Sequence, residues 1–264
     1  MAVIEQYILV VFGALVGAAI GSFVAAAGIR TTTTKSIVST PSSCDHCGQP
    51  LRSRDLIPVI SFLICRGRCR YCKSPLTWLY VGTEISFAVI GAFVASSADW
   101  NLSTTAACLS IILLGICVVS DFKAMLLPLP AMVAVGALGL ISQTLDRGFD
   151  GMVGSLTASA IAVATIGIPG LLYWLVRRTQ GFGEGDYWLM GAIGAWMHGI
   201  EPILLFYTAT VLCLASAIAE ALISGKSLQY LEPKPIGAFI SVCAVIYLSA
   251  KLYKLELYFD LAAL

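Results

Sequence analysis

The sequence predicts an all-α, polytopic membrane protein. Hydrophobic residues make up 58% of the 264 residues and charged residues 12%, whereas about a quarter of the residues in a soluble domain are charged. A helix needs about 20 apolar residues to cross the hydrocarbon core of a bilayer, and its backbone must be hydrogen-bonded internally because lipid offers no partners. Uncharged stretches of about this length recur along the chain, so we expect about eight transmembrane helices.

The connection after the first predicted helix is the only one long enough to form a small folded module. The predicted helices cover residues 7–29, 74–98, 100–120, 124–145, 151–176, 187–200, 202–219 and 235–250. The second stretch is interrupted only by Glu84. Glu84 is either a buried acid that needs a partner or an interfacial residue at the start of its helix, and the sequence favours neither.

The positions of Lys and Arg orient this bundle. No basic residue precedes the first apolar stretch and Arg30 follows it, so we interpret the stretch as a signal anchor whose start lies outside. With that orientation, the inner side carries thirteen Lys and Arg residues and the outer side three, in agreement with the positive-inside rule. Residues 31–75 then form a small cytoplasmic module. The net charge of +1 gives no reason to expect nucleic acid as a partner.

This cytoplasmic module contains two Cys-x2-Cys pairs, Cys44 with Cys47 and Cys69 with Cys72. Two such pairs complete a tetrahedral four-cysteine site of the zinc-ribbon type. Zinc is the expected metal because thiols stay reduced in the cytoplasm and disulfides are rare there. Cys65 and His46 could replace a ligand if the spacing is read differently, and unliganded cysteines are the alternative; we predict a structural zinc held by the four cysteines.

Two aspartates stand at ends of predicted helices: Asp121 follows a long apolar run, and Asp186 ends the sequence Gly-Phe-Gly-Glu-Gly-Asp. An ionisable side chain at membrane depth is costly and usually marks a functional site. Two carboxylates that share a proton can hydrolyse a peptide, one as the base on a water and the other as a hydrogen-bond donor to the scissile carbonyl. The charge topology places both at cytoplasmic helix ends. We therefore predict an intramembrane aspartyl protease.

The residues beside these acids suggest how the site is shaped. Gly181, Gly183 and Gly185 could adopt positive φ and let a substrate strand approach the backbone closely, although a flexible helix entry would have the same sequence. Pro128 interrupts the helix soon after Asp121 and would free backbone groups there, or it marks an ordinary turn between helices.

The expected depths of the two aspartates disagree. Counting about 1.5 Å per residue from the outer end of its helix, Asp121 lies roughly 30 Å in, near the inner face. The same count from His198 back to Asp186 gives only about 18 Å, which leaves Asp186 well inside the membrane. A dipping loop, helix tilt or a thinned bilayer would reconcile the two values.

The chain resembles the type IV prepilin peptidase family, the prepilin leader peptidase/N-methyltransferases, which are GxGD-type intramembrane aspartyl proteases. The resemblance spans nearly the whole chain. The motifs that carry it, in order, are Gly21-Ser22-Phe23, the four cysteines, Arg66-Gly67-Arg68, Glu84, Asp121 followed by Leu127-Pro128, Gly183-Glu184-Gly185-Asp186 and Pro235-Ile236-Gly237-Ala238-Phe239.

This resemblance implies a bifunctional enzyme of the bacterial inner membrane that serves type IV pilus assembly or protein secretion. Such an enzyme removes the basic leader of prepilins and pseudopilins at the cytoplasmic face and methylates the new N-terminus with S-adenosylmethionine. Asp121 and Asp186 would be the catalytic pair and Glu84 a candidate for the methyltransferase half. Residues 1–30 would form the first transmembrane helix, 31–75 the module associated with methyl transfer, and 76–264 the bundle with the protease site, surrounded by lipid.

The chain also departs from the family pattern. Ala25 stands where the family usually has Asn, Asp45 stands where it usually has Pro between the first two cysteines, and Leu129 replaces Asp after the Leu-Pro pair. Most departures lie in the N-terminal half, so a peptidase without methyltransferase activity is an alternative. A more distant alternative is a transporter whose buried acids bind protons or ions, which predicts inverted repeats that the sequence does not show.

Overall fold

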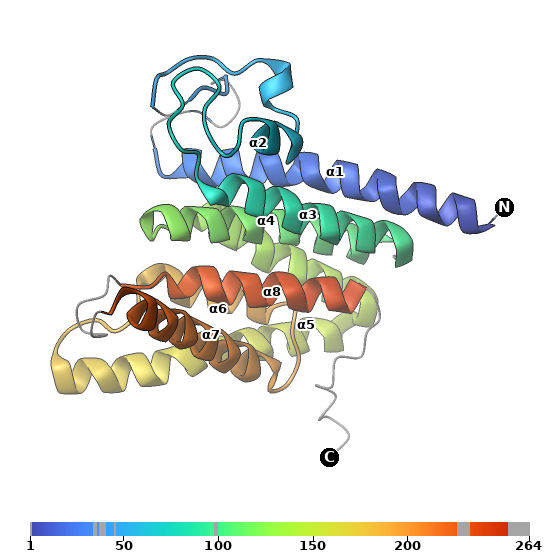
Figure 1. The fold of residues 1–264 in the computed structure, drawn as a ribbon. Helices are drawn as coiled ribbons and strands as arrows, with labels where there is room; N and C mark the ends of the chain where they lie inside the picture. The colour runs from blue at the N-terminus through green and yellow to red at the C-terminus, as the bar shows by residue number, and fades with distance from the viewer. Residues whose placement is uncertain are drawn as a thin grey trace. The chain divides into compact units, whose positions relative to one another are not determined.

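The computed structural model describes residues 2–33, 36, 41–44, 46–97, 100–225 and 233–252. The chain forms two compact units, Met1–Asp99 and Trp100–Leu264. Each unit is built mainly of long helices (Figure 1).

The first unit pairs two long helices and carries the cysteine module between them in sequence. Its elements are α1 (Ala2–Thr31), the 3-10 turn η1 (Ser53–Asp55), the short α2 (Ile60–Ile64) and α3 (Trp78–Ser97). Figure 1 shows α1 and α3 side by side, with the loops of the module gathered at one end of the pair. The sequence predicts a bundle over residues 76–264, whereas the structural division places α3 with α1.

Glycines at every fourth position let α1 and α3 approach closely. A Cβ atom added to Gly17 would lie 2.1 Å from the carbonyl oxygen of Phe87, and one added to Gly21 would lie 2.6 Å from that of Thr83. Gly13 meets α3 in the same way. Small residues at this spacing are the usual means by which membrane helices bring their backbones together, because packing rather than the hydrophobic effect holds them there.

The second unit is a bundle built around a short buried helix. Its elements are α4 (Leu102–Ala124), α5 (Leu129–Arg177), α6 (Glu184–Gly194), α7 (Glu201–Ser224) and α8 (Ile236–Leu252). The central helix α6 contacts α5, α7 and α8. Its side chains Leu189, Met190 and Ile193 are buried. A helix that is apolar and covered on several sides is expected to lie in the interior of a bundle.

The long α5 consists of two helical parts. Gly148 has φ 64° and ψ −142°, outside the helical region, and separates them. Gln143 before it and Ser155 after it bind the same turn: Gln143 Nε2 donates to the carbonyl of Trp196 at 3.2 Å, and Ser155 Oγ donates to that of Ala195 at 2.9 Å. The two parts therefore fold against one turn, and they correspond to the helices predicted over 124–145 and 151–176.

The all-helical, polytopic fold that the sequence predicts is confirmed. Five helices of the described chain, α1, α3, α4, α5 and α7, are long and apolar enough to cross a membrane, and α8 is a shorter apolar helix. The predicted span over 187–200 was wrong in length. There α6 has 11 residues, about 16 Å, and the chain turns after Gly194.

The α1–α3 contact generates a stability prediction. Gly17→Leu should lower the thermal unfolding temperature in detergent, because the new side chain has no space against the backbone of α3 and overpacking costs about 1–3 kcal/mol. Gly82→Leu is the matched control, since no atom lies within 4 Å of a Cβ at that position. Equal melting temperatures of the two variants would contradict the close packing.

Candidate active site and metal site

Asp121 lies in the last turn of α4 and is buried, with 5% of its surface exposed. Its Oδ2 accepts a hydrogen bond of 2.6 Å from the backbone N–H of Ala238. Ala238 is the third residue of α8, and the first amides of a helix have no partner within the helix. The Ala238 N–H also reaches the carbonyl of Pro235 at 3.2 Å, so Asp121 shares this donor, and the start of α8 is a favourable place for a negative charge.

Asp186 lies in the first turn of α6 and is also buried, with 8% exposed. Its Oδ2 accepts a hydrogen bond of 3.0 Å from the backbone N–H of Gly183, the residue that precedes the helix. The carboxylate therefore caps the N-terminus of its own helix. As with Asp121, a backbone amide holds one of its oxygens.

Gly237 brings the two carboxylates together. A Cβ atom added to Gly237 would lie 2.9 Å from Asp186 Oδ1 and 3.0 Å from Asp121 Oδ2. The two oxygens are therefore less than about 6 Å apart, the range over which like charges disfavour each other's ionisation. The two acids lie at the same level, contrary to the depth arithmetic. That count assumed that the helix containing Asp186 ends at the outer face near His198, but α6 ends at Gly194 and its first turn lies beside the start of α8.

Leu127, in the turn between α4 and α5, lies beside the point where the two carboxylates approach Gly237. α4 ends at Ala124, Met125 adopts a left-handed conformation with φ 51°, and Pro128 precedes α5. Within this turn, the Leu127 side chain would contact a Cβ at Gly185 at 3.1 Å and one at Gly237 at 2.8 Å. Pro128 therefore stands directly before a helix, as expected for an ordinary turn between two helices. The same turn places Leu127 beside Gly185 and Gly237, next to the two acids.

Three residues of this site are not predicted as site residues from the sequence, and the glycines have a different role from the expected one. Leu127, Gly237 and Ala238 had been noted only as parts of the family motifs. The expected positive φ is absent: Gly183 has φ −72°, and Gly181 and Gly185 are not among the described glycines with positive φ. Gly181 and Gly185 instead allow close packing. A Cβ at Gly181 would lie 3.1 Å from Tyr173, and Gly185 faces Leu127.

The four predicted metal ligands converge in the first unit. The sulfur atoms of Cys44, Cys47, Cys69 and Cys72 all lie within 4.8 Å of one another, and none of the four is in a disulfide. The Sγ atoms of Cys44 and Cys72 are 3.8 Å apart. Four sulfurs bound tetrahedrally to zinc at about 2.3 Å would be about 3.8 Å apart, so the residues fit this metal. Cys65 does not belong to the cluster.

Two matching turns hold these cysteines. Cys44 N–H donates to the carbonyl of Gln49, and Cys69 N–H donates to that of Ser74. An isolated antiparallel bridge closes each turn, between Ser43 and Pro50 and between Arg68 and Pro75. Hydrogen bonds with Ser74 also lower the pKa of the Cys72 thiol to about 6, which favours the thiolate that binds metals.

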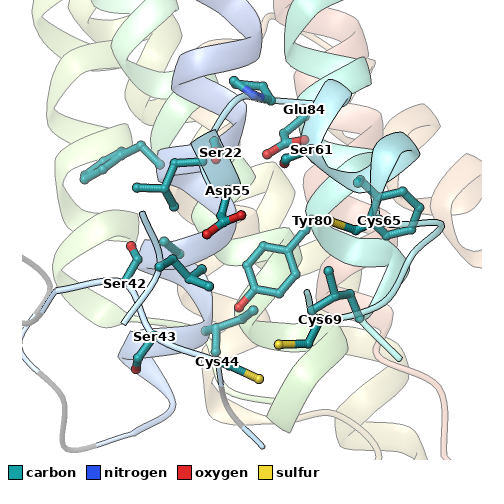
Figure 2. Close-up of a pocket in the computed structure, with 18 of the residues that line it drawn as sticks. Ser22, Ser42, Ser43, Cys44, Asp55, Ser61, Cys65, Cys69, Tyr80 and Glu84 are labelled. Carbon is teal, nitrogen blue, oxygen red and sulfur yellow. The ribbon is translucent and has the colours of Figure 1, made fainter. Parts of the chain in front are cut away.

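Glu84 is buried, with 7% exposed, and lies two turns inside α3, which begins at Trp78. This favours the buried alternative over the interfacial one. Its Oε2 accepts a hydrogen bond of 2.7 Å from the backbone N–H of Val59. Glu84 lines a cavity of about 460 Å³ that α1, α3 and the cysteine module enclose (Figure 2).

Asp55 lines the same cavity but is already paired. It accepts hydrogen bonds from Arg70 Nε at 2.7 Å and from the Tyr71 hydroxyl at 3.1 Å. Burial favours the neutral acid, yet the donors, led by Arg70, outweigh this and hold the pKa of Asp55 below its ordinary value. Asp55 thus joins η1 to the second cysteine turn.

The fold and the paired acids define a polytopic membrane protein with a carboxylate site inside its helical bundle. The family model described as the bacterial Peptidase A24 N-terminal domain matches residues 15–98, and the model of the type IV leader peptidase family matches residues 108–225. The boundary between the two matches falls at the boundary between the structural units. The chain belongs to the type IV prepilin peptidase family.

Several curated relatives carry the name prepilin leader peptidase/N-methyltransferase. The protein of Bacillus subtilis is 29% identical over 247 residues, which cover 90% of this chain and 92% of the relative. Those of Aeromonas hydrophila and Neisseria gonorrhoeae are 28% and 27% identical, and the alignments cover 78% and 75% of this chain and 70% and 68% of the relatives. No solved structure matches the chain significantly.

The cysteine cluster predicts one zinc ion per chain. Cys69→Ser should lose the metal from the purified protein, because a closed site needs all four thiolates. Cys65→Ser should keep it, since Cys65 lies outside the cluster. Elemental analysis by mass spectrometry measures both. Retention of zinc by Cys69→Ser, or its loss from Cys65→Ser, would contradict the assigned ligands.

Proposed function

We propose that this protein removes the leader peptide of prepilins or pseudopilins and then N-methylates the newly exposed N-terminus. The names of the relatives support both activities, and the family models match both units. The single observation that carries the peptidase assignment is the convergence of Asp121 and Asp186 on Gly237 in the second unit.

Asp121 and Asp186 act as one pair in the proposed cleavage. At less than about 6 Å in a site of low polarity, ionisation of one carboxylate disfavours ionisation of the other, so we propose that the pair carries one proton. The ionised member takes a proton from a water, which attacks the scissile carbonyl carbon, while the protonated member hydrogen-bonds the carbonyl oxygen. The C–N bond then breaks and the leaving amine takes up a proton. Cleavage should therefore fall at both acidic and alkaline pH, with values that belong to the pair.

The first unit is the proposed place of methyl transfer. S-adenosylmethionine supplies the methyl group, and Glu84 is the candidate acid. The four cysteines would hold a structural zinc, which fixes the two cysteine turns relative to each other and takes no part in the reaction. The helices α1 and α3, which flank this module in sequence, would anchor it to the membrane.

The site is proposed to face the cytoplasm of a bacterial inner membrane. Lys123 lies in the last turn of α4 with Asp121, and Lys234 lies just before α8, whose first turn binds Asp121. Lys251 lies at the opposite end of α8. Lys and Arg gather on the inner side of membrane proteins, so the aspartate end is the inner one. The basic leader of the substrate would then lie among the cytoplasmic loops, and its apolar segment would lie in lipid beside the bundle.

Removal of either acid tests the pair. Asp121→Asn and Asp186→Asn should each lower leader cleavage by at least about 10²–10⁴-fold, because an amide can neither accept nor share the proton. Intact-mass analysis of a co-expressed prepilin measures cleavage. Asp150→Asn, at an exposed aspartate of the same unit, is the control and should cleave normally. Full cleavage by either pair variant would overturn the assignment.

Gly237→Ala tests the geometry without removing an acid. The added methyl group would press on both carboxylates and on Leu127, so cleavage should fall by about 10²-fold, as expected for a displacement of catalytic groups by about 1 Å. Gly154→Ala is the matched control, because no atom lies within 4 Å of a Cβ there. Equal cleavage rates for the two variants would show that Gly237 does not set the spacing of the pair.

A further inference from the structure

The cavity of the first unit has two chemically different ends. Figure 2 shows Glu84 and Ser61 at one end, Cys44 and Cys69 at the other, and Tyr80 between them. A volume of about 460 Å³ lies in the ordinary range for sites of small molecules. At the Glu84 end, the membrane-crossing helices α1 and α3 meet α2 and the Val59 turn, whereas the other end is formed by the polar loops that carry the cysteines.

The Glu84 side chain is not engaged by a cationic side chain of the described residues and so remains open to a ligand. Its one hydrogen bond to the described part of the chain comes from the neutral backbone N–H of Val59, and no cationic side chain among those residues pairs with it. Asp55, the other acid of the cavity, is neutralised by Arg70. A buried carboxylate without a charged partner is costly, and a cationic ligand would offset that cost.

The donor to Glu84 sits in a strained turn. Val59 has φ 61° and ψ −49°, and the N–H of Ile60 donates to the carbonyl of Pro58 at 2.6 Å. This is a γ-turn of the rare, strained type, here at a β-branched residue that strongly disfavours positive φ. Strain of this kind persists where the surroundings hold it and gathers at functional sites. The turn points the Val59 amide at Glu84 and so orients that carboxylate.

We propose that this cavity is the methyl-transfer site, and that Glu84 binds the free N-terminal amine of the cleaved substrate and receives its proton. The proposal rests on the proposed function. The amine begins an apolar membrane segment, so it reaches the cavity from the Glu84 end, where α1 and α3 lie. The sulfonium donor, which carries an adenine ring and polar groups, occupies the remainder of the cavity beside Tyr80 and the cysteine module.

The reaction balances with these groups. An α-ammonium passes one proton to the Glu84 carboxylate and becomes an amine with a free electron pair. That pair attacks the methyl carbon of the sulfonium, a C–N bond forms as the C–S bond breaks, and the donor leaves as a neutral thioether. The product is a methylammonium ion. The proton on Glu84 then passes to water, so the carboxylate is restored.

Other charged and titratable groups also line the cavity. They are Arg30 from α1, Asp55, Cys65, Arg68 and Arg70 from the module, and Tyr80 from α3, besides the predicted metal ligands Cys44 and Cys69. Glu84 differs from Asp55, the other carboxylate among them, because Asp55 is already engaged by Arg70. The acid that remains for a cationic ligand is therefore Glu84.

Glu84→Gln tests this role, because the amide oxygen can still accept the Val59 hydrogen bond while the proton acceptor is lost. At neutral pH the variant should cleave prepilin normally but methylate the product about 10²–10⁴-fold more slowly. Methylation should recover about tenfold or more by about pH 9.5, because a free α-amino group loses its proton near pH 8 without help. Glu5→Gln, at an exposed acid of α1, should show neither effect.

Binding of S-adenosylmethionine, measured by equilibrium dialysis, should be unchanged in Glu84→Gln, and its zinc content should match that of the wild type. Ser22→Phe, which places a ring in the cavity from α1, should lower donor binding and methylation while cleavage persists. Normal methylation by Glu84→Gln, no recovery at high pH, or normal donor binding by Ser22→Phe would overturn the inference while cleavage stands. A wild-type protein that cleaves without methylating would instead overturn the methyltransferase part of the proposed function.

Discussion

The hydrogen bond from the backbone amide of Ala238 to Asp121 is the contact on which the second unit depends. It joins the end of α4 to the start of α8 in a region where lipid offers no substitute donor, and an unpaired polar group there would cost several kcal/mol. Because Gly237 precedes this amide and has no side chain, the first turn of α6 can approach the same point. The positions of both aspartates therefore follow from the way α8 begins.

Both units hold their buried acids by the same device. Asp121, Asp186 and Glu84 each accept a backbone N–H, from Ala238, Gly183 and Val59 respectively. A backbone donor orients a carboxylate without cancelling its charge, unlike the guanidinium that pairs with Asp55. A carboxylate held in this way can still exchange a proton with a substrate. The proposed peptidase and methyl-transfer sites thus use one physical principle in two different surroundings.

Much of this architecture is predictable because its signals are local. The length of apolar runs indicates membrane helices, and two Cys-x2-Cys pairs indicate a four-cysteine metal site whatever surrounds them. The depth of Asp186 was not predictable, because counting residues assumes that each predicted helix begins at one face of the membrane. The glycines before Asp186 were correctly noticed but wrongly explained, since the same residue type serves positive φ and close packing, and only the neighbours distinguish the two.

The sequence by itself determined the class of protein, the four cysteines and the two aspartates, because each depends on composition or on spacing within a short segment. The tertiary structure decided that Leu127 and Gly237 meet these aspartates, and that the Val59 turn reaches Glu84 across 25 positions of the chain. Such approaches depend on how helices distant in sequence pack together. No local pattern records that packing, so the level of Asp186 and the partner of Glu84 emerged only from the folded chain.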